Sequence, residues 1–263
     1  MIRAAFFDID GTLVSMDTHR MREDTKEALF ALKKKGIRIF ISTGRHMQDI
    51  RTAKGDLLEG VPFDGYVLIN GQYCIAGEKQ QVIHKHPIPA SDIKSLVELL
   101  RTTPFPCVFL ERQDIYINVV NERVIKEQER VDLDIPPIED ISRALCADIY
   151  QVVPYVSMEE EKLIMSSMPH CSISRWSDTV ADIIPADGCK RVGVEKMLKH
   201  FQISPSECMA VGDGENDVDM LKYAGIGVAM GNAQSSVKAA ANYITDDIEK
   251  GGLCEALRHF GLL

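Results

Sequence analysis

Hydrophobic and polar residues alternate in blocks along the first part of the chain. Residues 4–9 and 37–41 are nearly all apolar, as expected of strands that are buried on both faces of a sheet. Between them, residues 22–35 carry apolar side chains at roughly helical spacing and end in three lysines before Gly36, which is typical of a helix C-terminus. After another predicted helix, residues 66–69 form a third apolar run. This strand and helix order predicts a parallel sheet with helices on both faces.

The pattern changes in the middle of the chain. Asn70-Gly71 is typical of a hairpin turn, and strands over 72–76 and 81–85 are the expected flanking strands. Between about 86 and 185 the pattern indicates a mixture of helices and strands. The expected elements are a helix over 91–101 and strands over 107–110, 115–119, 149–153, 171–175 and 180–184. Such an α+β mixture, without the earlier rhythm, indicates a second domain.

The alternating rhythm returns in the last third of the chain. The expected elements there are a helix over 189–200, a strand over 208–211, a helix over 218–224, a strand over 226–229 and a helix over 235–241. The simplest interpretation is a doubly wound, Rossmann-like α/β core that is interrupted by an inserted α+β domain. We place the core at 1–84 and 186–263 and the inserted cap domain at 85–185.

Composition narrows the functional class. The chain has 263 residues, enough for two modest domains, and a net charge of −9, which argues against nucleic acid as a main partner. The N-terminal residues do not resemble a signal peptide, and no stretch reaches the roughly 18 apolar residues of a membrane span. The seven cysteines are scattered without a CxxC spacing, which favours reduced thiols. These features predict a cytoplasmic protein.

Polar residues gather where the predicted core strands end. In an open α/β sheet, ligands bind at the carboxyl ends of the strands, so these segments are expected to meet at one cleft. They carry Asp8 and Asp10 after the first strand, Thr43 and Gly44 after the second, Asn70 after the third, and Asp213, Asn216 and Asp217 after residues 208–211. The four aspartates are the most unusual members of this set, because charge is costly near a buried strand.

Four carboxylates in one cleft repel one another unless a cation joins them. Oxygen ligands without a nearby histidine or cysteine suit Mg²⁺ and argue against zinc. Asp8 and Asp10 are two positions apart, so extended backbone would place both on one face, about 6–7 Å apart. That spacing would allow one acid to attack an electrophile while the other handles a proton.

The neighbouring polar groups indicate that the electrophile is a phosphoryl group. The Thr43 hydroxyl, the backbone N–H groups of the Thr43–Gly44 turn and the Lys190 ammonium, with a divalent cation, would form a phosphate cradle. Phosphoryl transfer needs charge neutralisation and an in-line nucleophile, and a metal-bound aspartate can attack phosphorus. Each residue alone is more often structural, and only the combination at strand ends indicates this chemistry.

The same residues lie in stretches that resemble the four motifs of the haloacid dehalogenase-like phosphatases. The matching stretches are FFDIDGTL (6–13), ISTGR (41–45), INGQY (69–73), Lys190 in DGCK and VGDGENDVDML (211–221). They occur in family order along nearly the whole chain and most resemble the Cof-type branch, class IIB, whose α+β cap is inserted after the third core strand. The resemblance is specific for fold and reaction type and says little about the substrate.

The resemblance implies a role for each matching residue. Asp8 would be the nucleophile that forms an aspartyl-phosphate, and Asp10 would protonate the leaving alcohol and then activate the hydrolytic water. An acid two residues after the nucleophile separates the phosphatases from the dehalogenases. The implied ligands are Thr43, Gly44, Lys190 and Asn216 for the phosphoryl group, and the Asp8 carboxylate, the Asp10 carbonyl and Asp213 for Mg²⁺. Asp217 would orient metal-bound water or Lys190.

Two positions depart from the family pattern. Lys190 is followed by Arg191 where a glycine is common, and we expect Arg191 on the helix surface. Gln72 replaces a small residue after Asn70-Gly71.

The sequence thus predicts a Mg²⁺-dependent phosphomonoester hydrolase for small phosphate esters, with sugar phosphates favoured. It would work as a monomer or weak homo-oligomer, without nucleic acid or membrane. The alternatives are a phosphotransferase or mutase with the same intermediate, and a non-catalytic ligand sensor on the same fold.

Overall fold

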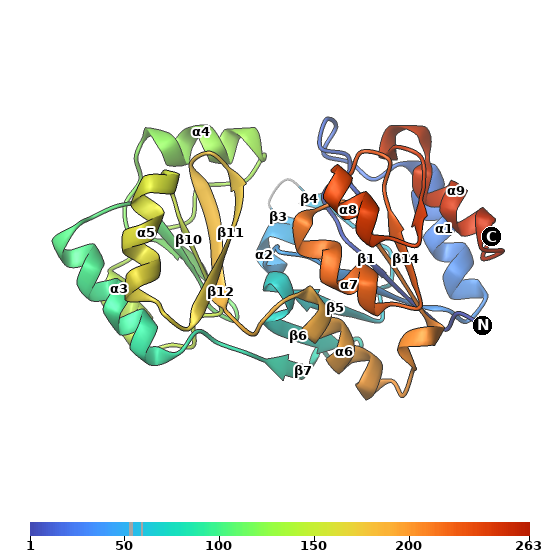
Figure 1. Ribbon diagram of the computed structural model, residues 1–263, viewed down its shortest axis with the longest axis horizontal. Helices are drawn as coiled ribbons and strands as arrows, with labels where there is room; N and C mark the ends of the chain where they lie inside the picture. Colours follow the sequence, from blue (N-terminus) through green and yellow to red (C-terminus); the bar gives the residue numbers. More distant parts are fainter. Residues whose placement is uncertain (53–54, 59) are drawn as a thin grey trace. The chain divides into compact units, whose positions relative to one another are not determined.

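The computed structural model describes residues 1–52, 55–58 and 60–263, and its chain divides into two compact units (Figure 1). The first, here called the core unit, comprises Met1–Arg45, Ile50–Lys85 and Cys189–Leu263. The second, here called the inserted unit, comprises His46–Asp49 and His86–Gly188.

An eight-stranded sheet forms the centre of the core unit, in the order β15-β14-β13-β1-β2-β5-β6-β7. Neighbours from β15 to β5 pair in parallel, whereas β6 and β7 are added antiparallel. The strands are β1 (Ala4–Phe7), β2 (Arg38–Ser42), β5 (Gly65–Leu68), β6 (Tyr73–Ala76), β7 (Gln81–Lys85), β13 (Cys208–Gly212), β14 (Ile226–Ala229) and β15 (Tyr243–Ile244). The continuous apolar run of β1 reflects its central place, because all four residues are fully buried between two helical layers.

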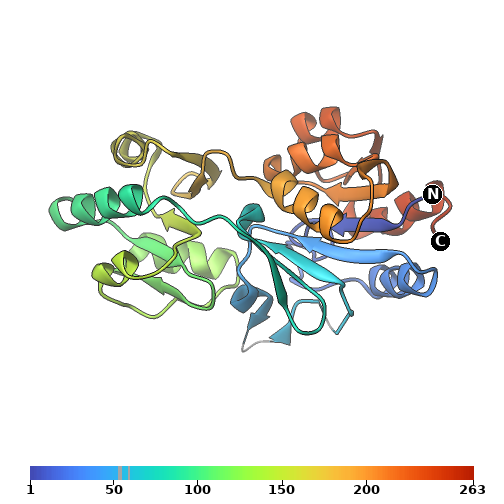
Figure 2. The ribbon, with the colours of Figure 1, turned by 90° about the horizontal axis from the view of Figure 1, so that it is seen from below.

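Helices cover both faces of this sheet, and Figure 2 shows α1 and α6 on opposite sides of it. The helices of the core unit are α1 (Glu23–Lys34), α6 (Lys190–His200), α7 (Val218–Tyr223), α8 (Ser235–Ala240) and α9 (Gly252–His259). The short helix α2 (Met47–Ile50) belongs to the inserted unit except for its last residue. Short 3-10 segments are η1 (Ile69–Gly71), η3 (Pro205–Glu207), η4 (Glu215–Asp217) and η5 (Ile248–Lys250), and β3 (Arg51–Thr52) pairs with β4 (Gly55–Asp56). The arrangement confirms the predicted doubly wound α/β fold class.

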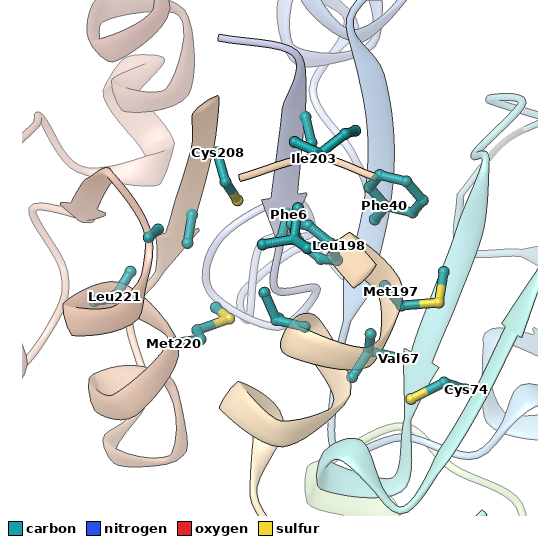
Figure 3. Packing of buried hydrophobic residues seen from close by; sticks show 14 of the residues in the cluster. Phe6, Phe40, Val67, Cys74, Met197, Leu198, Ile203, Cys208, Met220 and Leu221 are labelled. Carbon is teal, nitrogen blue, oxygen red and sulfur yellow. The ribbon is translucent and has the colours of Figure 1, made fainter. Parts of the chain in front are cut away.

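The packing under α6 and α7 fixes these helices, and thereby Lys190, relative to the sheet (Figure 3). Phe6 and Phe40 stack with their ring centroids 4.6 Å apart. Met197 and Leu198 of α6 and Met220 of α7 belong to the same buried cluster. Burial of each such side chain contributes about 1.5–3 kcal/mol to the free energy of folding. The start of α6, which carries Lys190, is therefore held firmly against the sheet.

The inserted unit contains a five-stranded antiparallel sheet in the order β11-β12-β10-β8-β9. Its strands are β8 (Cys107–Leu110), β9 (Ile115–Ile117), β10 (Gln151–Pro154), β11 (Cys171–Ser177) and β12 (Val180–Pro185). Its helices are α3 (Ala90–Thr102), α4 (Glu122–Arg130), α5 (Met158–Ser167) and the 3-10 segment η2 (Ile141–Leu145). Leu96, Phe109 and Tyr116 lie in its own apolar core, as expected of an α+β domain.

One local prediction is only partly right. Asn70-Gly71 lies in a hairpin turn, as predicted, but this turn, which includes η1, joins the antiparallel pair β5 and β6 and not the strands near 72–76 and 81–85. The hairpin of β6 and β7 instead turns at residues 77–80, where Gly77 and Gln80 have positive φ angles. In the described part of the chain, no helix is long and apolar enough to cross a membrane.

Candidate active site

The site lies where β13, β1, β2 and β5 end side by side. Backbone hydrogen bonds continue past the strand ends, since Asp8 N donates to Val211 O at 3.0 Å and Thr43 N donates to Val67 O at 2.9 Å. The loops that follow these strands are therefore held at one edge of the sheet, as parallel topology requires.

Three of the four predicted aspartates meet in one buried group. Carboxylate oxygens of Asp8, Asp213 and Asp217 lie within 4.8 Å of one another. Lys190, the first residue of α6, joins two of them, because its Nζ lies 2.8 Å from Asp8 Oδ1 and 2.7 Å from Asp217 Oδ1. Lys190 is only 1% exposed. A buried lysine is tolerated here because two carboxylates compensate its charge.

Burial and repulsion between neighbouring carboxylates raise the pKa values of Asp8 and Asp213. Burial raises the pKa of Asp8 well above its usual value, with Lys190 opposing and the other aspartates adding to the rise. Burial, aided by Asp217, raises the pKa of Asp213 to about 7. Burial alone would lower the pKa of Lys190, but Asp217 and Asp8 outweigh it, so that pKa is raised. One ammonium group thus faces three carboxylates, which leaves an excess of negative charge suited to a divalent cation.

Both carboxylate oxygens of Asp217 accept hydrogen bonds, from Lys190 and from the loop that follows β13. Its Oδ2 accepts hydrogen bonds from the backbone N–H groups of Asp213 (3.0 Å) and Gly214 (2.9 Å), while Oδ1 accepts from Lys190. The Gly212 position has no room for a side chain, since an ideal Cβ there would lie 2.5 Å from Asp217 Oδ2. With both Asp217 oxygens engaged, Asp8 and Asp213 are the carboxylates best placed to hold a metal.

Asp10 does not share the position of Asp8. Strand β1 ends at Phe7, so the extended geometry that would place both acids on one face stops before Asp10. The Asp10 carboxylate instead accepts two hydrogen bonds from the Arg45 guanidinium, from Nε at 2.7 Å and from a terminal nitrogen at 2.8 Å. Such a two-point contact fixes the orientation of the carboxylate. Arg45 lies inside the quoted ISTGR stretch, yet its role was not predicted.

The predicted phosphate-binding residues converge from three segments. Thr43 is buried and its Oγ1 accepts from Arg45 N at 3.1 Å. Because Thr43 N is already bonded to Val67 O, the expectation that both N–H groups of this turn face a phosphate is wrong, and Gly44 N is the remaining candidate donor. Asn216 reaches across from the loop after β13, and its Nδ2 donates to Asn70 Oδ1 at 2.9 Å.

Further residues support the loop that carries Asp8 and Asp10. Thr12 Oγ1 donates to Asp213 Oδ1 at 2.7 Å. Gly11 has φ +78°, and an ideal Cβ there would lie 2.2 Å from Asp213 Oδ2, so only glycine fits. Asn232 Nδ2 donates to Gly11 O at 2.8 Å. The sequence motif contained Gly11 and Thr12, whereas nothing in the local pattern pointed to Asn232.

The two departures from the family pattern have different surroundings. Arg191 is on the surface of α6, as predicted, with its guanidinium 3.4 Å from the Glu195 carboxylate. Gln72 is fully buried, and its Nε2 donates to Asn70 O at 3.0 Å. Gln72 thus supports the turn that carries Asn70, whereas Arg191 contacts Glu195 and the ring of Tyr223.

Comparison with known proteins agrees with this geometry. The sequence model of the haloacid dehalogenase-like hydrolases matches residues 5–257, and the chain belongs to this family. It is a phosphatase of that superfamily and falls in the Cof-type branch, which confirms the resemblance read from the motifs.

Three relatives cover nearly the whole chain. The solved structure of the subclass IIB sugar phosphatase BT4131 is 40% identical, with a TM-score of 0.89 over 99% of this chain and 100% of its own. The structure of BT1666 from Bacteroides thetaiotaomicron is 34% identical, with a TM-score of 0.89 over 100% and 96% of the two chains. The 5-amino-6-(5-phospho-D-ribitylamino)uracil phosphatase YitU of Bacillus subtilis (strain 168) is 27% identical over 96% of this chain and 95% of its own.

Proposed function

We infer that the protein is a Mg²⁺-dependent phosphomonoester hydrolase that acts through an aspartyl-phosphate on small phosphorylated metabolites. The observation that carries this proposal is the buried Lys190, held between Asp8 and Asp217 beside a third carboxylate. Phosphoryl transfer requires a nucleophilic carboxylate beside a fixed positive charge. It also requires carboxylates that are not fully neutralised by the protein, so that they can hold a metal ion.

The proposed reaction has two steps. An Asp8 carboxylate oxygen forms a bond to phosphorus while the bond from phosphorus to the ester oxygen breaks, and Asp10 gives a proton to the departing alcohol. Asp10 then takes a proton from water as the water oxygen attacks phosphorus and Asp8 leaves as a carboxylate. Asp10 enters the first step protonated and the second ionised, and the two hydrogen bonds from Arg45 hold it in a fixed orientation for these proton transfers.

The remaining residues bind the phosphoryl oxygens. Lys190, Thr43 and Asn216 would supply an ammonium, a hydroxyl and a carboxamide, and Gly44 a backbone N–H. Asp8, Asp213 and the Asp10 carbonyl would hold Mg²⁺, which supplies charge neutralisation on the transferring group. The excess of carboxylates over cations in the buried group supports this assignment.

The substrate class follows from the relatives. BT4131 is a sugar phosphatase, and YitU acts on a phosphate carried by a ribityl chain. Both ligands place a phosphate monoester on a hydroxylated carbon chain, so we propose sugar and polyol phosphates as the first compounds to test. The seven free cysteines support a reducing, cytoplasmic location.

A panel of phosphorylated metabolites, assayed for phosphate release with Mg²⁺ and with a chelator, tests the proposal. We expect metal-dependent release from sugar phosphates. Transfer of the phosphoryl group to an added alcohol without free phosphate would favour the phosphotransferase. No release and no transfer by folded, Mg²⁺-loaded protein would favour the sensor and contradict the proposal.

The effect of Mg²⁺ on thermal stability is expected to depend on pH. The raised pKa values of Asp213 and Asp8 mean that the metal-free folded state binds more protons than the unfolded chain above pH 3.8. This contribution to stability is present in acid and is lost as pH rises through about 7. Mg²⁺ competes with those protons, so calorimetry should show a larger Mg²⁺-induced rise in Tm at about pH 8 than at about pH 6.

The matched control is Asp219→Asn, which removes an exposed carboxylate close in sequence to the acidic group. It should keep the pH-dependent Mg²⁺ effect, whereas Asp213→Asn should lose it. An equal rise at both pH values in the native protein would show that protons and metal do not compete for these carboxylates.

A further inference from the structure

The turn between β5 and β6 has an uncommon backbone. Ile69, Asn70 and Gly71 have φ angles of 52°, 51° and 93° in succession. Left-handed backbone is uncommon outside glycine and is an outlier for a β-branched residue such as Ile69. Conformations of this kind persist only where surrounding contacts impose them, and they cluster at functional sites. The residues that contact this turn therefore indicate which part of the site its unusual conformation serves.

The turn is hydrogen-bonded to the loop that follows β2. Asn70 N donates to Thr43 O at 3.0 Å, and Ile69 N donates to Arg45 O at 3.2 Å. The Asn70 side chain packs on the residue between them, because an ideal Cβ at Gly44 would lie 3.2 Å from Asn70 Nδ2 and Oδ1. Two backbone bonds and one side chain thus define the conformation of the Thr43–Arg45 segment.

The same turn contacts the two other segments of the candidate phosphate site. Asn70 Oδ1 accepts the hydrogen bond from Asn216 Nδ2. Gly71 lies against the start of α6, where an ideal Cβ would be 2.3 Å from Cys189 O and 3.3 Å from Lys190 Cα. Every segment that supplies a proposed phosphate ligand, at Thr43, Lys190 and Asn216, therefore touches these three residues.

We propose that Asn70 is a positioning residue for phosphoryl binding, acting through the carboxamide of Asn216. The inference rests on the proposed function. A carboxamide nitrogen carries two hydrogens, and the bond to Asn70 Oδ1 uses one of them and fixes the plane of the group. The second hydrogen is then held in a set direction for a phosphoryl oxygen. Asparagine suits position 70 because it tolerates left-handed backbone and also supplies the acceptor.

A double-mutant cycle of Asn70→Gly and Asn216→Ala tests this role. Glycine keeps the left-handed backbone and removes the carboxamide, which means both the acceptor for Asn216 and the contact with Gly44, and the cycle isolates the part that depends on Asn216. We expect Asn70→Gly to raise both KM and the inhibition constant for inorganic phosphate about tenfold in the presence of Mg²⁺. In the Asn216→Ala background the same change should alter them less than about twofold, because the group that Asn70 orients is gone.

A matched control and a second variant separate positioning from folding. Gln80→Gly changes another residue with positive φ, in the exposed β6–β7 turn, and should leave the kinetics unchanged. Asn216→Ala alone removes the carboxamide that Asn70 orients, at a position exposed to solvent, and should itself weaken phosphate binding. An unchanged phosphate constant in Asn216→Ala would contradict the inference even if Asn70→Gly did not fold.

The cycle also distinguishes the inference from the proposed function. Equal, multiplicative effects of Asn70→Gly in both backgrounds would overturn the positioning role while phosphate release by the native protein still supported the function. If the native protein released no phosphate from any ester but bound inorganic phosphate with the expected coupling, the inference would hold and the hydrolase would be wrong. Native protein that neither hydrolyses esters nor binds phosphate would overturn both.

Discussion

Asp8→Asn is expected to abolish phosphate release, lowering kcat by about 10⁴-fold or more, because the carboxamide cannot form the aspartyl-phosphate. The variant should nevertheless fold, since the asparagine oxygen can still accept from Lys190 Nζ. Burial raises the pKa of Asp8, so its ionised form is unfavourable in the metal-free protein. Removing that charge should therefore leave the metal-free Tm equal to or above that of the native protein. Steady-state kinetics and calorimetry measure the two effects.

Loss of activity without loss of stability separates a chemical role from a structural one. The exposed Asp219→Asn variant serves as the control and should retain native turnover. Retention of most activity in purified Asp8→Asn would show that Asp8 is not the covalent nucleophile. A large fall in Tm would show instead that the Asp8 carboxylate mainly supports the fold through its contact with Lys190.

The strands of the core could be predicted because they are buried on both faces. Residues such as those of β1 read as continuous apolar runs, and the helix α1 ends in lysines that mark its C-terminus. Two C-terminal elements, β15 and α9, were not predicted. Strand β15 has only the two residues Tyr243–Ile244, too short for a periodic pattern. Asn70-Gly71 does close a hairpin, but between β5 and β6, because local pattern does not show that β6 pairs with β5 as well as with β7.

The candidate site was predictable where sequence motifs place residues at strand ends. Asp8, Asp213 and Asp217 do meet there, with Lys190 among them. The sequence could not show which residue of a distant loop forms a hydrogen bond with each site residue. Hydrogen bonds from Arg45 to Asp10, and across 221 positions from Asn232 to Gly11, depend on the folded arrangement alone. Local spacing carries no information about such contacts.

Lys190→Met is expected to damage both the fold and the reaction. The ammonium group is fully enclosed and compensates Asp8 and Asp217, so its removal leaves two buried carboxylates without their cation. Removing one partner of a buried ion pair costs about 3–5 kcal/mol in the free energy of unfolding. Loss of a fixed positive group beside the transferring phosphoryl should lower kcat by about 10²–10³-fold or more. Denaturant unfolding and steady-state kinetics measure these losses.

Adding Asp217→Asn to Lys190→Met separates the two losses. Asparagine removes one of the uncompensated charges, so the double variant should recover part of the unfolding free energy but none of the turnover. The adjacent Arg191→Met is the matched control, because that guanidinium lies on the surface beside Glu195, and its loss should change stability by less than about 1 kcal/mol. Recovery of turnover together with stability in the double variant would mean that Lys190 serves the fold and does not bind the phosphoryl group. Full turnover in Lys190→Met would contradict the proposed phosphate site directly.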